Sequence, residues 1–208
     1  MQEGKGLKRA AMSASSRTAL ELFVAKILIR STLSEEEQAA IIGLRTDVQR
    51  AAPNHDIVRP GDVLKHCCLI GAGAAGRYAQ GRDGGRAITA LHLPGDMADL
   101  HSFPLPMAST GIQALSHTTV LRVPHAAIRD IIAAHPRLEL VFWRECMVDS
   151  VILAEWAFNI GRRSALARTA HLFCELACRR TGNTHSQDAE ILMDATQSHV
   201  ADMLGLTS

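Results

Sequence analysis

Turn signals recur at short intervals between Pro53 and Val123, and they constrain the fold more than any other feature of the sequence. RPGD at 59–62 and LPGD at 93–96 each contain a Pro-Gly turn, and GRDGG at 81–85 lies between YAQ and RAITALHL. Asp-Gly is a residue pair typical of the tight turn of a β-hairpin. Short strands separated by turns at intervals of about ten residues predict an antiparallel β-barrel or jelly roll.

Helical patterns flank this turn-rich region. Ser34 and Glu37 form a capping box, which predicts a helix through about residue 44. The segment HAAIRDIIAAH at 125–135 has isoleucines at helical spacing, and a second helix should begin at Pro136. We expect Asn159-Ile160-Gly161 to end that helix and Ser164 to cap the next one, through residue 180. The sequence therefore predicts an α+β fold.

The helix expected over 137–159 is apolar on two sides. A helix of that kind must bury both sides, one against its own barrel and the other against a second surface. The same helix of a second copy of the chain is the simplest such surface, which predicts a homodimer. A helix buried wholly within one chain is the alternative. The residues expected at the dimer interface are Leu140, Met147, Val151, Ala154 and Phe158.

Composition narrows the class of protein. A net charge of +1 over 208 residues gives the whole chain no electrostatic preference for nucleic acid or anionic membranes, although five arginines and one acid between Gly161 and Arg180 make a basic region. The five cysteines form no disulfide framework, and no apolar run reaches the length of a membrane span. We therefore expect a cytoplasmic protein with no membrane partner, whose residues 1–18 form a disordered tail.

The last thirteen residues, TQSHVADMLGLTS at 196–208, read as the first half of a two-helix unit. Thr196 can cap a helix, with Gln197 and Ser198 in its first turn. Val200 and Leu204 make an inward face, Gly205 supplies a turn, and Ser208 would cap a following helix.

Taken in order, these motifs resemble the Crp-Fnr family of bacterial transcription regulators. The most specific likenesses are GRRSALARTAHLFCEL at 161–176 and the ending at 196–208. The resemblance implies a sensor β-roll of the jelly-roll, cyclic-nucleotide-binding type at 19–135, with flanking helices, and a dimerisation helix at 136–160. It implies that 161–208 hold part of a winged helix-turn-helix, with the recognition helix and the wing not included. Whether the ending at Ser208 is natural is left open by the sequence.

The resemblance also implies partners and contacts. The partners are operator DNA, if the full DNA-binding domain is present, a second copy of the chain and RNA polymerase. Phosphate contacts are expected at a helix start and near the hinge. The residues that carry this expectation are Arg162, Arg163, Thr196, Gln197 and Ser198.

An effector pocket is expected beside the LPGD turn. Its candidate residues are Gly95, Asp96, Asp99, Ser109 and Thr110. Members of the family that bind cyclic nucleotides carry a Gly-Glu pair and an arginine here, to hold the ribose and the phosphate. Asp99 and Leu100 fall at the Gly-Glu positions, Ala108 falls at the arginine position, and no arginine lies between Arg86 and Arg122. Because a buried phosphate without a cation is costly, we expect an effector other than a cyclic nucleotide.

We expect no cofactor, no bound metal and no catalytic residues. An iron-sulfur centre would need about four clustered cysteines. Three weaker candidates for metal or haem ligands can be named, and ordinary core packing is favoured for each. They are His66-Cys67-Cys68, the face His171, Cys174 and Cys178, and the pair His92 and His101, which would suit a cupin-like enzyme.

The sequence thus favours a dimeric DNA-binding transcription regulator and not an enzyme. A truncated interaction protein is the alternative, which would dimerise without reading DNA sequence. A metal-dependent enzyme on a cupin-like roll is the third hypothesis. Effector, operator and the sign of regulation are not readable from the residues.

Overall fold

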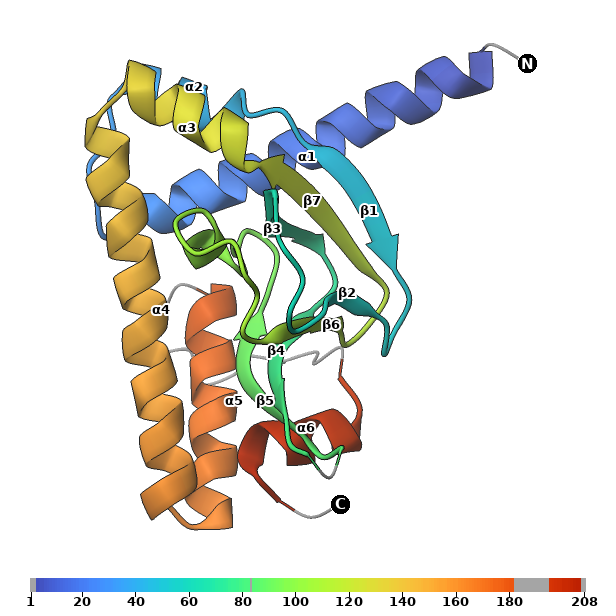
Figure 1. Ribbon diagram of the computed structural model, residues 1–208, viewed down its shortest axis with the longest axis vertical. Coiled ribbons are helices and arrows are strands. Elements are labelled where there is room, and N and C mark those ends of the chain that lie inside the picture. Colours follow the sequence, from blue (N-terminus) through green and yellow to red (C-terminus); the bar gives the residue numbers. More distant parts are fainter. Residues whose placement is uncertain (1–2, 83, 182–194, 207–208) are drawn as a thin grey trace.

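The computed structural model describes residues 3–82, 84–181 and 195–206 of the chain. It has the α+β architecture expected, with two antiparallel sheets in the middle and helices around them (Figure 1). The elements are α1 (Glu3–Leu28), α2 (Glu35–Ile42), β1 (Asp47–Ala51), β2 (Asp56–Val58), β3 (His66–Ala72), β4 (Ala75–Gln80), β5 (Arg86–His92), the 3-10 helix η1 (Leu100–Ser102), β6 (Gly111–Ala114), β7 (Thr118–Pro124), α3 (His125–Ala134), α4 (Arg137–Arg162), α5 (Ala165–Thr181) and α6 (Gln197–Leu204).

The two sheets form the predicted antiparallel roll. One has the strand order β1-β7-β3 and the other β2-β6-β4-β5. A core of small and branched side chains lies within the roll, including Cys68, Ile70, Ile112 and Val120. The predicted hairpin at 81–85 joins β4 to β5, with Gln80 paired to Arg86. Of the two residues expected at its turn, Gly84 has a positive φ of 86°, whereas Asp83 lies outside the described residues.

Helix α1 differs from the expectation of a disordered tail over residues 1–18. The structure has residues 3–18 as the first part of one helix that continues to Leu28. Alanine, leucine, lysine and arginine are strong helix formers, so this composition supports a helix as readily as a loose tail. Once residues 19–27 are anchored, each added residue extends an existing helix and needs no new nucleus.

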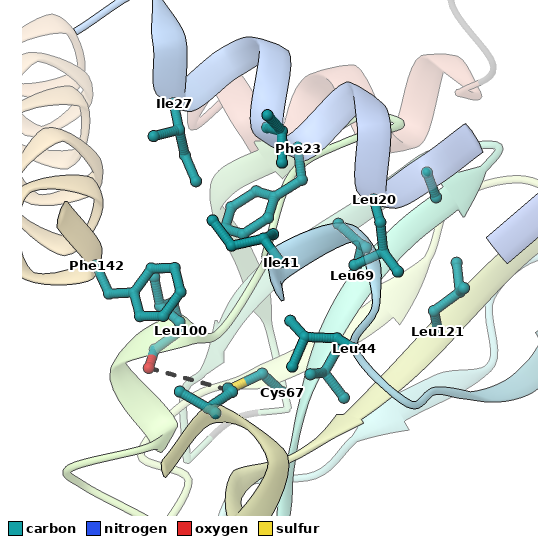
Figure 2. Close-up of a cluster of buried hydrophobic side chains, with 14 of the residues drawn as sticks. Leu20, Phe23, Ile27, Ile41, Leu44, Cys67, Leu69, Leu100, Leu121 and Phe142 are labelled. Carbon is teal, nitrogen blue, oxygen red and sulfur yellow. Dashed lines mark hydrogen bonds between the residues drawn. The ribbon is translucent and has the colours of Figure 1, made fainter. Parts of the chain in front are cut away.

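The second half of α1 belongs to the main core. Leu20, Phe23 and Ile27 are each at most 3% exposed, and Figure 2 shows them directed towards side chains of other elements. Phe142 of α4 stacks on Phe23 with ring centroids 6.4 Å apart. This cluster joins α1, α2, α3 and the start of α4 to the outer face of the β3–β7 sheet.

Strand β3 is buried on both faces. Cys67 faces the helical core and Cys68 faces the interior of the roll, and both are 0% exposed. Adjacent residues of a strand point to opposite faces, so both thiols can be buried only where both faces are covered. Helices cover the outer face of this sheet, so alternate side chains enter two cores. Burial raises the pKa of both thiols, which keeps them protonated.

Helix α4 is longer than the sequence predicted. It runs to Arg162, so the expected break at Asn159-Ile160-Gly161 does not occur there, and the chain leaves the helix at Arg163. One glycine in a helix costs only about 1 kcal/mol, which the packing of Trp156 and Asn159 on the helix's buried side can offset. The opposite side of α4 carries large apolar side chains that are exposed in the single chain.

The two C-terminal helices begin as predicted. The hydroxyl of Ser164 accepts a hydrogen bond from the Ala167 amide at 3.3 Å, and that of Thr196 accepts one from the His199 amide at 3.2 Å. Gly205 ends α6 in the left-handed conformation, at φ 59°. Helix α6 packs beside β5, and buried side chains of α5 join the same group, so the roll and the C-terminal helices share one apolar cluster.

The two isoleucines near the end of α1 test whether this helix is part of the core. Ile27 is 0% exposed and Ile29 is 71% exposed. Ile27→Ala should lower the free energy of unfolding by about 2–4 kcal/mol, because it leaves a cavity. The matched change Ile29→Ala should cost less than about 0.5 kcal/mol. Urea unfolding followed by circular dichroism measures both, and equal losses would contradict the placement of α1.

Candidate functional site

One candidate site joins the sensor roll to the helices. It is a cavity of about 460 Å³ between α1, β5, the 95–101 segment, α4 and α5. Gly95 and Asp96 line it, as expected of an effector pocket. Asp99, Ser109 and Thr110, the other three residues predicted for such a pocket, do not line it. Its remaining walls come from helices that the motif around the LPGD turn could not reveal.

Asp96 connects three elements at the edge of this cavity. Its carboxylate lies 2.5 Å from Lys26 Nζ of α1, and it also accepts a hydrogen bond from Arg179 of α5. The amide of Leu93 donates to the same carboxylate at 2.7 Å, which holds the Pro-Gly-Asp turn. Burial acts to raise the pKa of Asp96, but the two cations outweigh it, and the pKa lies below its ordinary value. Asp96 is therefore an ionised anchor for α1 and α5.

Gly95 allows α1 to approach this turn. Its φ is +84°, and a Cβ there would lie 2.8 Å from the Cβ of Leu22. Its amide donates to the Ile70 carbonyl at 2.8 Å. A larger residue would be strained in its backbone and would push α1 away from Asp96.

Asp99, which was expected to line an effector pocket, is buried and hydrogen-bonded to the backbone of β3. It is 2% exposed, and its Oδ1 accepts a hydrogen bond from the Cys68 amide at 2.5 Å. Its Oδ2 has no partner among the residues that the structure describes. Desolvation dominates and raises its pKa to about 6.

Ala108, which falls at the arginine position of members that bind cyclic nucleotides, makes two backbone hydrogen bonds. The Ala108 amide donates to the Asp62 carbonyl at 2.9 Å, and the Gly61 amide donates to the Ala108 carbonyl at 2.7 Å. Ser109 beside it is exposed and Thr110 is half-buried. These residues therefore close the roll and supply no cationic group for a phosphate.

Two histidines face the cavity together. His92 is 4% exposed and His101 is half-buried, and both line the cavity. The Nε2 atom of His92 has no hydrogen-bond partner in the described part of the chain. Burial lowers its pKa to about 3, so His92 is neutral. The structure thus brings the two candidates of the cupin-like hypothesis to one cavity.

The other candidate metal ligands make ordinary contacts. Arg122 Nε lies 2.6 Å from His66 Nε2, and His171 Nδ1 lies 3.0 Å from the amide nitrogen of Asn159. Cys174 is exposed, while Cys67 is within the core. Over residues 3–82, 84–181 and 195–206, no group of three His, Cys, Asp or Glu side chains is placed to hold a metal ion.

A stripe of exposed apolar side chains follows α4. It contains every residue predicted for the dimer interface, with Leu140 at 66%, Val151 at 70% and Phe158 at 51% exposed. Such a stripe is unusual on a surface helix, because apolar residues normally face inward. The full set of predicted residues on this exposed side is Leu140, Met147, Val151, Ala154 and Phe158.

The residues predicted to contact phosphate fall into two groups. Thr196, Gln197 and Ser198 are exposed at the start of α6. Arg162 is exposed at the end of α4, whereas Arg163 is paired with Glu155 at 2.8 Å. The C-terminal Gly205 of α6 lies near Ile160, so the arginines are at the opposite end of α6 from Thr196. The structure therefore does not bring the two groups together.

Helix α6 is docked on the roll through a histidine that the sequence did not single out. His199 is 5% exposed, and its Nε2 lies 2.7 Å from Asn54 Oδ1. Its Nδ1 accepts from the Thr196 amide, so the neutral ring donates through Nε2 to Asn54. Asn54 has a left-handed φ of 65°, a conformation that asparagine tolerates.

Comparisons with known proteins agree with this architecture. Residues 48–135 match the cyclic nucleotide-binding domain family. The fumarate and nitrate reduction regulatory protein of Vibrio cholerae is 24% identical over 187 residues, covering 88% of this chain and 73% of that relative. The nitrogen fixation regulation protein FixK of Azorhizobium caulinodans is 26% identical over 157 residues, covering 75% of this chain and 62% of that relative. The structure of FixK2 from Bradyrhizobium japonicum matches with a TM-score of 0.66 at 19% identity, covering 79% of each chain.

The class that these features define is a cyclic nucleotide-binding fold extended by a long helix and C-terminal helices. The family match and the similar regulators support membership of the Crp-Fnr family of transcription regulators, as the sequence motifs indicated. Within the described residues, no helix is both long enough and apolar enough to span a membrane.

The raised pKa of Asp99 predicts how the free energy of unfolding depends on pH. Its pKa of about 6 lies above the ordinary 3.8, so the folded protein binds an extra proton between these values, and this group lowers stability as pH rises through that window. At pH 7.5 the penalty approaches about 3 kcal/mol. Asp99→Asn removes the charge but leaves an unpartnered amide, which costs about 1–3 kcal/mol. The net gain at pH 7.5 should be about 1 kcal/mol.

Denaturant unfolding at pH 4, 6 and 7.5 measures this gain, which should turn into a loss at pH 4, because the charge penalty is then absent and the cost of the unpartnered amide remains. Asp130, an exposed aspartate of α3, offers the matched control. Asp130→Asn should change stability by less than about 0.5 kcal/mol at each pH. A gain for Asp99→Asn that did not depend on pH would contradict the shifted pKa.

Proposed function

We propose that this chain acts as a dimeric transcription regulator that binds DNA through its C-terminal helices. The observation that carries the proposal is the joint placement of a sensor-type roll, an exposed apolar stripe on α4 and a capped α6. The relatives named as regulatory proteins of fumarate and nitrate reduction and of nitrogen fixation match over most of the chain. On this proposal it works in the cytoplasm, where RNA polymerase would be a further partner.

The dimer would form by pairing two α4 helices along the exposed stripe. Leu140, Val151 and Phe158 span more than four turns of one helix, which gives a long apolar contact. The other side of α4 is already committed, because Leu138, Phe142 and Trp156 are buried within the chain. One helix would therefore carry contacts from the roll to the partner subunit.

Contact with DNA would use the exposed start of α6. Free amides at a helix N-terminus and nearby hydroxyl groups suit phosphate oxygens. The docked position of His199 on Asn54 holds this helix against the roll, and the arginines lie at its far end. A shift of α5 and α6 relative to the roll would be needed for the start of α6 and the arginines to contact the same DNA backbone.

Charge placed on the α4 stripe should prevent dimerisation. Val151→Asp would bury an unpaired carboxylate at the interface and should weaken the dimer by at least about 100-fold, since an unpaired buried charge costs several kcal/mol. Val63 on the roll is 67% exposed, close to the 70% of Val151, so Val63→Asp is the matched control. Sedimentation velocity over a range of concentrations measures both. An unaltered chain that is monomeric at about 10 µM would refute the proposed dimer.

Binding of the 208-residue polypeptide to duplex DNA should be weak and independent of sequence. We expect dissociation constants of about 1–100 µM near 150 mM salt for its own promoter and for a scrambled duplex, with a steep fall as salt rises. Arg162→Gln should reduce the slope of log K against log salt by about 1, because one phosphate contact is lost. Fluorescence anisotropy gives these values.

The exposed Arg45 of the roll supplies the control for this loss. Arg45→Gln carries the same change of charge and should leave the salt slope unaltered. Nanomolar binding to the promoter alone would show that residues 1–208 already read base sequence. An absence of binding at 50 mM salt would count against DNA as the partner.

A further inference from the structure

The cavity between the roll and the helices has balanced, fully paired charges. Three cations line it, Lys26, Arg30 and Arg179, together with three acids, Asp96, Glu145 and Asp149. Lys26 and Arg179 are held by Asp96, and Arg30 lies 3.7 Å from Glu145. The third acid, Asp149, is paired with Arg77 at 2.7 Å. An anionic ligand would have to break one of these pairs to gain a cation.

Two residues that line the cavity each carry a buried polar atom without a hydrogen-bond partner in the part of the chain that the structure describes. The two atoms are Nε2 of His92 and Oε1 of Glu145. Burial raises the pKa of Glu145 and lowers that of His92. A buried polar group without a partner costs free energy, so a ligand that satisfies it gains affinity.

The rest of the wall is mostly apolar. Phe23, Met97, Leu100, Val148 and Ile152 contribute to it. Volumes of about 300–1,000 Å³ are typical of sites for small molecules, and mostly apolar walls with a few polar groups are their usual character. The cavity therefore suits a molecule with an apolar body and one hydrogen-bonding group.

We propose that this cavity binds a neutral, mostly apolar molecule carrying one hydroxyl or N–H donor, with Glu145 and His92 as the groups that recognise the donor. A carboxylate such as Glu145 can only accept when ionised, which selects a donor. The neutral imidazole of His92 accepts from such a donor through Nε2 when its proton is on Nδ1. That such a molecule is the effector rests on the proposed function as a regulator.

A ligand in the cavity would lie against a residue of the C-terminal helices. Arg179 of α5 lines the cavity and also donates to the Leu91 carbonyl at 2.9 Å. Glu175, one turn earlier, accepts from Arg179 at 3.0 Å and from Trp156 of α4 at 2.7 Å. A ligand beside Asp96 would therefore bear on the contacts that hold α5 against the roll.

Two sets of matched probes test the ligand class. The first is 2-naphthol, 2-methoxynaphthalene and 2-naphthoate, and the second is indole, 1-methylindole and indole-3-carboxylate. Titration calorimetry with the whole chain at pH 7 should give dissociation constants of about 0.01–1 mM for 2-naphthol or indole. The methyl-capped member and the carboxylate of the same set should bind at least tenfold more weakly.

Variants place the recognition within the cavity. Glu145→Leu and His92→Phe should each bring the ratio of affinities for 2-naphthol and 2-methoxynaphthalene towards 1. The ratio is measured within one variant, so it does not depend on equal stability. Glu139 is exposed on the same helix, and Glu139→Leu should leave the ratio unchanged. Circular dichroism verifies that each variant is folded.

Three results would overturn the proposal. They are a carboxylate that binds as tightly as its neutral donor, a methyl cap without effect, and no saturable binding by either donor. Dimerisation and DNA binding are measured without any ligand. If they hold while the probes fail, only this inference is lost. If the probes bind as expected while dimerisation and DNA binding fail, the cavity stands and the proposed function is lost.

Discussion

The carboxylate of Asp96 holds together parts of the chain that are far apart in sequence. It sits in a Pro-Gly-Asp turn of the roll and pairs with Lys26 of α1 and Arg179 of α5. All three side chains are mostly buried, with between 15% and 26% of each exposed. A buried charge is tolerated only when it is paired and hydrogen-bonded, so loss of either cation would leave a costly group behind. The cavity, the docking of α5 and the path of α1 all depend on this arrangement.

Helix α4 has three separate tasks along its length. Its first turns bury Leu138 and Phe142 in the core with α1, and Trp156 near its end joins the cluster with α5 and α6. Between these, Glu145 and Asp149 face the cavity. The remaining side is the exposed apolar stripe proposed to meet a partner. A change at the cavity would therefore act on an element that also faces the second subunit and the C-terminal helices.

The contacts of α6 give the C-terminal helices a defined position on the roll. Met203 and Leu204 are buried beside β5, and His199 hydrogen-bonds to Asn54. These contacts mix apolar with polar groups.

The sequence by itself determined the elements whose signals are local. The capping box at Ser34, the helix cap at Thr196, the hairpin after β4, the left-handed Gly205 and the two-sided pattern of α4 depend on neighbouring residues, and the structure has each of them. The family was readable for the same reason, since its motifs are contiguous. The helical start of α1 and the continuation of α4 past Gly161 were missed, because helix propensity there leaves the outcome to packing. Only the tertiary structure decided the cavity: Lys26, Glu145 and Arg179 come from three helices, and burial with pairing of charges is a property of their meeting in space.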